Sequence, residues 1–247
     1  MVSYIAQRVD SYDSVCIILK GHAPNKSMKV FVTHYTKLCE RKADILEQFQ
    51  THNITDYEFI EQFDQGRLSD EEVAMFSTDI HPAMMSLTLK HFHAYRQIKD
   101  RYDHALIFED DVILCENFSE IFAKYVADLP VDYDMLFIGD GCKLHIEPHM
   151  LVKDKCIYEK CTQPTHWGGL GGTRCLDSYL MSKKCAVKLC EYIDLNNHIR
   201  LSSDLWMNVA MRECNLKVYW AEPTIVTQGS ESGKYKSESG PQFVPKF

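Results

Sequence analysis

The chain has 247 residues, of which 45% are hydrophobic and 25% are charged, enough for one large domain with a substantial core. Its formal net charge is −8 and no run of Lys and Arg exceeds two residues, which argues against nucleic acid as the main partner. No stretch reaches the roughly 20 apolar residues of a membrane-spanning helix. Ten cysteines without a Cys-x-x-Cys pair argue against a structural zinc site and favour reduced thiols.

Apolar runs and helical spacing alternate along the N-terminal half of the chain. They predict strands at 15–19, 30–33, 57–60 and 105–108, and helices after residue 36 and from about 82 to 98. Thr36 is the expected cap of the first helix, and Pro82 stands just before the second. A turn at 21–26 and a loop at 64–70 separate these elements.

The C-terminal half continues the same alternation. Helices are predicted near 116–126, 183–193 and 203–214, and strands at 135–138, 179–181 and 216–220. A polar stretch at 142–167 shows little periodicity, a glycine cluster follows at 168–172, and the tail at 229–247 is rich in loop residues. The order predicts an α/β fold in a single domain spanning 1–247, with residues 1–28 as an N-terminal extension or an extra strand.

Three consecutive carboxylates, Glu109, Asp110 and Asp111, follow the predicted strand at 105–108. The carboxyl ends of strands in α/β sheets are where ligands bind. Clustered carboxylates repel one another and raise each other's pKa unless a cation neutralises them. Oxygen ligands of this kind suit Mg²⁺ or Mn²⁺, which complete their shell with phosphates and water. The alternative is a solvated acidic turn that caps the next helix.

Four blocks of the chain, taken in order, are similar to one known family. They are 30–35 with 39–41; 86–95; 106–112; and 179–182 with 203–206 and 228–235. Together they resemble glycosyltransferase family 25, the lipopolysaccharide and collagen-type sugar transferases, in its short bacterial and viral forms. The resemblance implies a GT-A fold, a Rossmann-like mixed, mostly parallel sheet flanked by helices. It also implies a nucleotide-sugar donor, a divalent metal and inversion at the anomeric carbon.

The metal would be Mn²⁺ or Mg²⁺, held by Asp111 with Glu109 or Asp110 assisting. Many metal-dependent transferases supply a late histidine to the metal, and this chain lacks one. The third protein ligand is therefore open between Gln228, Asp140 and water alone.

The donor, expected to be UDP-linked, would lie against the end of the first strand. Its expected contacts are Thr33, His34, Tyr35, Arg41, Glu109, Asp110, Ser230 and Lys234. Tyr35 would stack on the base and Arg41 would reach a ribose or phosphate, although a packed aromatic and a solvated arginine are the plain alternatives. The loop at 228–234 would cradle phosphate with its backbone N–H groups and fold over the donor.

Asp204 is the candidate general base that takes the proton from the acceptor hydroxyl. It falls in the first turn of a predicted helix that Ser202 or Ser203 can cap, so it has a rigid mount. Its alternative role is to complement the helix dipole. Asp140, which follows the strand at 135–138, is the main rival.

The acceptor is expected to contact Trp167 and Gly169, because a tryptophan face stacks well on sugar rings. His91 is a further candidate, since it matches the histidine of the family's Ser-His helix. Lys90 replaces the serine of that motif, and a buried histidine satisfied by a neighbour is the alternative for His91.

The predicted function is metal-dependent, inverting transfer of a sugar from a nucleotide-sugar to a hydroxyl of a glycan or glycoprotein. A catalytically inactive GT-A-like carbohydrate- or nucleotide-binding protein and a nucleotidyltransferase are the alternatives. The N-terminal residues show no secretory signal. We therefore expect a cytoplasmic location, in the host cytoplasm if the source is viral.

Overall fold

The computed structural model describes residues 28–160 and 174–236. The predicted strand at 15–19, the turn at 21–26 and the glycine cluster at 168–172 lie outside the described residues. The six helices of the described part are α1 Cys39–Thr51, α2 Asp70–Ala74, α3 Pro82–Arg101, α4 Phe118–Asp128, α5 Lys183–Leu195 and α6 Ser203–Glu213. Its strands are β1 Lys29–Thr33, β2 Tyr57–Ile60, β3 His104–Glu109, β4 Val112–Leu114, β5 Met135–Phe137, β6 Ile157–Glu159, β7 Ser178–Ser182, β8 Val218–Ala221 and β9 Val226–Gln228.

Seven strands form one mixed sheet in the order β2-β1-β3-β7-β5-β8-β6. Strands β2, β1 and β3 are parallel, β7 runs antiparallel to both β3 and β5, β8 is parallel to β5, and β6 is antiparallel to β8. Five strands therefore point one way and two point the other. The predicted α/β class with a mixed, mostly parallel sheet is confirmed.

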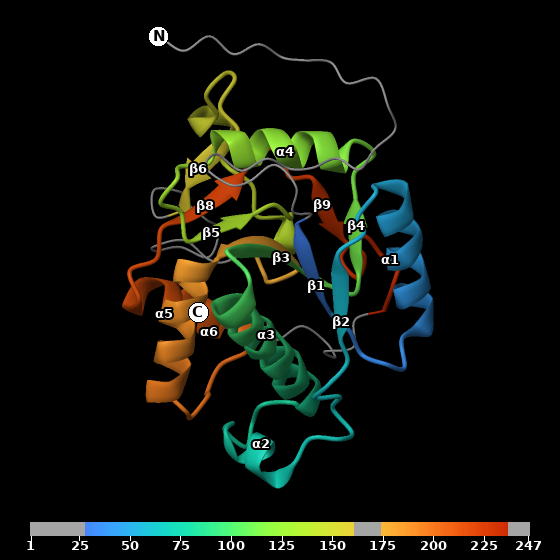
Figure 1. The fold of residues 1–247 in the computed structure, drawn as a ribbon, viewed down its shortest axis with the longest axis vertical. Helices are drawn as coiled ribbons and strands as arrows, with labels where there is room; N and C mark the ends of the chain where they lie inside the picture. Colours follow the sequence, from blue (N-terminus) through green and yellow to red (C-terminus); the bar gives the residue numbers. More distant parts are fainter. Residues whose placement is uncertain (1–27, 161–173, 237–247) are drawn as a thin grey trace.

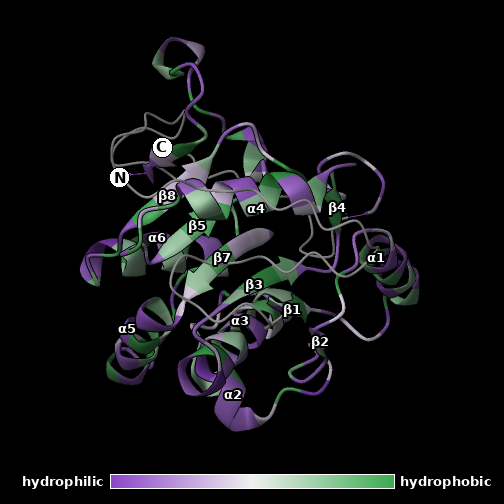
Figure 2. Cartoon of the chain, turned by 45° about the horizontal axis from the view of Figure 1, so that its top comes forward, coloured by the Kyte–Doolittle hydropathy of each residue, from purple (hydrophilic) through white to green (hydrophobic). Residues whose placement is uncertain are grey.

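Helices cover both faces of this sheet (Figure 1). Residues of α3, α5 and α6 share one buried apolar cluster with one face of the sheet, and residues of α1 and α4 share another with the opposite face. Neighbouring residues of β3 belong to different clusters: Leu106 packs in one and Ile107 in the other. A strand buried on both faces reads as a continuous apolar run, which is why β3 was visible in the sequence. In Figure 2 the central strands are coloured hydrophobic and α2 largely hydrophilic.

The structure corrects one predicted cap and adds elements that the sequence reading missed. Helix α1 begins at Cys39 with Leu38 at the N-cap, so Thr36 does not cap it. The Thr36 hydroxyl instead donates to Asp64 Oδ2 at 2.5 Å. Helix α2 was missed, although Ser69 and Glu72 form a capping box at its start, a pattern visible in the sequence. The short strands β4, β6 and β9 were also missed.

Strands β4 and β9 pair as a separate two-stranded antiparallel sheet. Their register sets Val112 opposite Gln228, so the end of β9 lies beside the acidic residues that precede β4. None of the helices in the described ranges is long and apolar enough to cross a membrane.

Candidate active site

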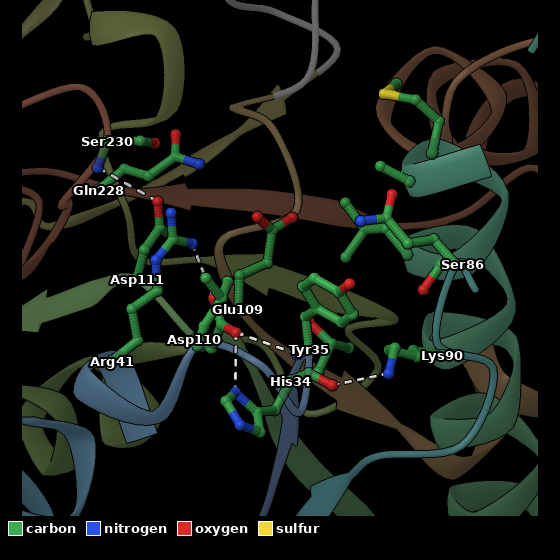
Figure 3. Close-up of a pocket in the computed structure, with 16 residues that line it drawn as sticks. His34, Tyr35, Arg41, Ser86, Lys90, Glu109, Asp110, Asp111, Gln228 and Ser230 are labelled. Carbon is green, nitrogen blue, oxygen red and sulfur yellow. Dashed lines mark hydrogen bonds and ion pairs between the residues drawn. The ribbon is translucent and has the colours of Figure 1, made fainter. Parts of the chain in front are cut away.

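A cleft with an empty volume of about 700 Å³ opens at the carboxyl ends of β1 and β3 (Figure 3). Because these strands are parallel and Thr33 pairs with Glu109, the residues that follow both strands meet at one edge of the sheet. Ligand sites of α/β folds commonly form in this position. The lining residues are Thr33, His34, Tyr35, Leu38, Arg41, Gln65, Ala83, Met84, Ser86, Leu87, Lys90, Glu109, Asp110, Asp111, Gln228 and Ser230.

Asp110, the middle acid, is held by protein groups on both carboxylate oxygens. Its Oδ2 accepts from the Tyr35 backbone N–H at 3.1 Å and lies 2.9 Å from His34 Nδ1, while Oδ1 accepts from Arg41 at 2.9 Å (Figure 3). Its side chain is only 8% exposed. Asp110 therefore fixes the His34–Tyr35 turn against β3, and its oxygens are already engaged by cationic and N–H donors.

Lys90 supports the same turn from the opposite side, a role that the sequence reading missed. Its ammonium donates to the His34 carbonyl at 2.6 Å and to Asp64 Oδ1 at 2.8 Å. Burial lowers the pKa of Lys90. Burial alone would raise the pKa of Asp64, but hydrogen bonds from Lys90 and Thr36 hold that pKa below its ordinary value. A lysine on the apolar side of α3 was the available signal, since buried lysines are rare unless paired.

Glu109 and Asp111 face the cleft and lack such pairing. Burial raises the pKa of Glu109 well above its ordinary value, and the negative charges of Asp111 and Asp177 raise it further. Burial also raises the pKa of Asp111. Among the described residues, the buried Asp111 Oδ1 has no hydrogen-bond partner. Two like-charged carboxylates with an unused oxygen fit a divalent cation, which would relieve their repulsion.

Gln228 and Ser230 complete this wall of the cleft. The Ser230 backbone N–H donates to Asp111 Oδ2 at 3.2 Å, and the Gly229 N–H donates to the Asp111 carbonyl at 2.6 Å. Gln228 lines the cleft at the end of β9. The described ranges contain no group of three or more His, Cys, Asp or Glu side chains that could hold a metal. A cation here would rely on one or two carboxylates, an amide and non-protein oxygens, which suits Mg²⁺ or Mn²⁺.

The segment after Ser230 packs against α1 and engages two of the predicted donor contacts, Lys234 and Arg41, in contacts within the protein. Lys234 Nζ lies 2.7 Å from Asp44 Oδ2, and the Tyr235 hydroxyl donates to the same carboxylate. Lys234 is not among the residues that line the cleft. Arg41 does line it, but its guanidinium donates to Asp110 and to the Lys236 carbonyl and lies over the Tyr235 ring.

The two candidate bases lie outside the lining of the cleft. Asp204 occupies the first turn of α6, as predicted, with Ser202 at the N-cap position. The Ser202 hydroxyl does not cap the helix and instead donates to Asp204 Oδ1 at 2.5 Å. Asp204 is near enough for its charge to raise the pKa of Glu109. Asp140 precedes a short 3-10 turn, Gly141–Lys143, and its charge acts on Asp177.

Asp177 is a further acid that the sequence reading missed. It is fully buried, and burial together with Asp111 and Asp140 raises its pKa to about 8. It fits because its neighbours are glycines: a Cβ on Gly139 would lie 2.0 Å from Asp177 Oδ2, and one on Gly141 would lie 2.8 Å from Oδ1. The Glu109 N–H donates to the Asp177 carbonyl at 2.8 Å. Asp140 is the candidate that the sequence predicts here, whereas the glycines on either side of it, Gly139 and Gly141, make room for this second acid.

The predicted acceptor contacts divide into two groups. Trp167 and Gly169 lie outside the described residues. His91 is 1% exposed and lies behind Glu109 rather than in the lining of the cleft. Its Nδ1 is 2.8 Å from the Tyr179 hydroxyl, and burial lowers its pKa to about 3. Burial and the Tyr179 contact fit the alternative on the Nδ1 side only, because Nε2 has no hydrogen-bond partner among the described residues.

The chain belongs to a sugar-transferase family. The family model described as glycosyltransferase family 25 (LPS biosynthesis protein) matches residues 28–207, well over half of the chain, so the chain is a member of glycosyltransferase family 25. The mixed, mostly parallel sheet is the arrangement that the resemblance to this family implied. A protein of Acanthamoeba polyphaga mimivirus, named provisionally as a glycosyltransferase, is 26% identical over 148 residues. That match covers 57% of this chain and 44% of the mimivirus protein, so the chain spans less than half of that relative.

Two solved structures are also similar. One is the Drosophila β-1,4-galactosyltransferase 7 in complex with manganese, UDP-Gal and xylobiose, at 15% identity and a TM-score of 0.38, covering 82% of this chain and 67% of that one. The other is a glycosyltransferase involved in glycosylation of the major capsid of PBCV-1, at 9% identity and a TM-score of 0.40, covering 82% of this chain and 94% of that one. Both TM-scores lie below 0.5, so these likenesses do not by themselves establish the fold.

Proposed function

We propose that this chain transfers a sugar from a UDP-linked donor to a hydroxyl of a glycan or glycoprotein, with inversion, and that the reaction requires Mn²⁺ or Mg²⁺. The observation that carries the proposal is the pair formed by the half-buried Glu109 and the buried Asp111, which line a cleft at the end of β3; among the described residues, one Asp111 oxygen has no hydrogen-bond partner. Family membership makes sugar transfer the chemistry that this pair would serve.

Each wall of the cleft would have its own task. Glu109, Asp111 and Gln228 would hold the cation, which, when bound, stabilises the negative charge that grows on the departing diphosphate. The His34–Tyr35 turn, braced by Asp110 and Lys90, would bind the nucleoside with its backbone groups and the Tyr35 ring. A braced turn binds its ligand with little ordering cost.

UDP release tests this proposal. The protein is incubated with UDP-Gal, UDP-Glc and related donors, with Mn²⁺ or with EDTA, and released UDP is measured. We expect release that needs the metal and falls about 100-fold or more in Asp111→Asn, because a positioned electrostatic contact to the leaving group is lost. Glu120→Gln, a change at an exposed acid of α4, should leave the rate unchanged.

The alternatives are separated by adding two measurements: melting with UDP and Mn²⁺, and incubation with UTP and a sugar phosphate. An inactive binding protein would be stabilised by UDP and Mn²⁺ without releasing UDP from any donor. A nucleotidyltransferase would release pyrophosphate from UTP and a sugar phosphate. Release that continues unchanged in EDTA and in Asp111→Asn would contradict the metal-dependent reaction.

We propose Asp204 as the general base, with Asp140 as the rival, because Ser202 and the first turn of α6 fix the Asp204 carboxylate. Asp204→Asn should lower kcat about 100-fold or more while UDP and Mn²⁺ still bind, since general base catalysis is typically worth 10²–10⁴-fold. The same result for Asp140→Asn, with a normal rate in Asp204→Asn, would exchange the two roles.

A further inference from the structure

Behind Glu109, three buried ring side chains place their polar atoms in a line. The Tyr95 hydroxyl lies 3.0 Å from the Tyr179 hydroxyl, which lies 2.8 Å from His91 Nδ1. His91 Nε2 in turn lies 3.6 Å from Glu109 Oε1. All three rings are at most 1% exposed. Buried polar groups are unfavourable unless they are paired, so the line is ordered from one end to the other.

The elements of the fold hold this line rigidly. His91 and Tyr95 are one helical turn apart on α3, so they lie on the same face of that helix. Tyr179 belongs to β7, which pairs antiparallel with β3, the strand that ends at Glu109. The His91 and Tyr179 rings are stacked, with centroids 5.9 Å apart and an interplanar angle of 30°.

Counting donors and acceptors fixes the hydrogens along the line. Within the described part of the chain, Tyr179 is the only hydrogen-bond partner of the Tyr95 hydroxyl, so the Tyr95 hydrogen points to Tyr179 Oη. Tyr179 then donates its own hydrogen to His91 Nδ1. A neutral imidazole whose Nδ1 accepts carries its hydrogen on Nε2, the nitrogen that faces Glu109. The reverse order would bury the Tyr95 hydrogen without an acceptor.

The Nε2–H group of His91 is thus a donor, and the nearby acceptor is Glu109 Oε1. Among the described residues, His91 Nε2 has no hydrogen-bond partner, and Glu109 Oε1 lies just beyond hydrogen-bond range. A shift of the Glu109 carboxylate by about 0.5 Å would complete the bond. One oxygen of Glu109 would then be held from behind, while the carboxylate still faces the cleft (Figure 3).

We propose that His91, held in its Nε2–H tautomer by Tyr179 and Tyr95, is a positioning residue that orients the Glu109 carboxylate toward the divalent cation. The inference rests on the metal-dependent function proposed above. Hydrogen bonds that hold a metal ligand from behind fix its direction, and their loss typically weakens metal binding by about 10- to 100-fold. Tyr179 and Tyr95 act through His91, so their effects should diminish with distance from Glu109.

Electron paramagnetic resonance of free Mn²⁺ at saturating UDP tests this inference by direct binding. We expect the Mn²⁺ dissociation constant to rise most in His91→Met, by about 10-fold or more, less in Tyr179→Phe and least in Tyr95→Phe. His91→Gln, which keeps an N–H group near the position of Nε2, should recover part of the affinity. The matched control is Tyr125→Phe, which removes a buried hydroxyl bonded to the Pro223 carbonyl on the opposite face of the sheet and should leave Mn²⁺ affinity unchanged.

Melting temperatures in EDTA separate a loss of folding from a loss of metal binding. The two Tyr→Phe changes remove one oxygen atom each and keep the inference testable if His91→Met does not fold. Two results would overturn the inference: Mn²⁺ affinity as high as that of the wild-type protein in folded Tyr179→Phe and His91→Met, or an equally large loss of affinity in Tyr125→Phe. In either case the proposed function stands if Mn²⁺ binding still requires Asp111. Absence of Mn²⁺ binding by the wild-type protein would overturn both.

Discussion

Two pairs of acids in and beside the cleft differ in their partners. Asp110 and Asp64 are each paired with a cation, Asp110 with Arg41 and Asp64 with Lys90, and both support the His34–Tyr35 turn. Glu109 and Asp111 have no Lys or Arg ion-pair partner among the described residues, and one Asp111 oxygen has no hydrogen-bond partner there. The first pair is neutralised within the protein, whereas the second is complementary to a cation that the protein itself does not supply.

Removing the cation from a neutralised acid should give the largest loss of stability. Lys90→Met leaves Asp64 and the His34 carbonyl buried without their ammonium partner. We expect the free energy of unfolding, measured with urea, to fall by about 3–5 kcal/mol. The matched control is Lys42→Met, which breaks an exposed ion pair with Glu61 and should cost no more than about 1 kcal/mol. Equal losses in the two variants would mean that Lys90 does not brace the turn.

The buried acid Asp177, behind the cleft, predicts a pH dependence of stability in the absence of metal. The pKa of Asp177 is raised to about 8 in the folded chain, from an ordinary value near 4. Between these values the native state binds more protons than the unfolded state, so stability is greatest at low pH within this window and falls as pH rises.

Urea unfolding in EDTA between pH 7 and 8 measures this effect, because the histidines of the unfolded chain, with an ordinary pKa near 6.5, are largely neutral in that range. We expect a loss of about 1 kcal/mol per pH unit. Asp177→Asn should reduce the slope by removing one of the contributing acids. A flat profile in the wild-type protein would show that these acids are already compensated.

The smallest effect is expected at the segment that returns to α1. Lys234 pairs with Asp44 at the surface, away from the lining of the cleft. Lys234→Met should change the free energy of unfolding by no more than about 0.5 kcal/mol and leave UDP affinity, measured by calorimetry, unchanged. A large loss of UDP affinity would instead restore the phosphate-binding role predicted from the sequence.

The sequence predicted the place of the site because an apolar run buried on both faces ends directly at Glu109. It did not separate the roles of the three acids, because Asp110 and Asp111 lie in the turn between β3 and β4, where no strand period orders the side chains. The partners of Asp110 and Asp64 are separated by many residues along the chain, as Asp110 is from Arg41. No local pattern specifies such contacts.

The same limit explains the other missed residues. The surroundings of Asp177 depend on the strand order: because β7 lies between β3 and β5, Asp177 lies beside Gly139 and Gly141. The link between His91 and Glu109 likewise depends on how α3 packs on the sheet. The single-domain organisation, the cytoplasmic location and the acceptor contacts of Trp167 and Gly169 stay predictions.

A melting experiment with Glu109→Gln tests most directly whether Glu109 and Asp111, which have no Lys or Arg ion-pair partner among the described residues, hold a cation. In EDTA the variant should melt at a higher temperature than the wild-type protein, because the repulsion between the Glu109 and Asp111 carboxylates is gone. With Mn²⁺ and UDP the order should reverse, because only the wild-type protein gains stability from binding. A variant that melts lower in EDTA, or that gains as much from Mn²⁺ and UDP as the wild-type protein does, would contradict the account.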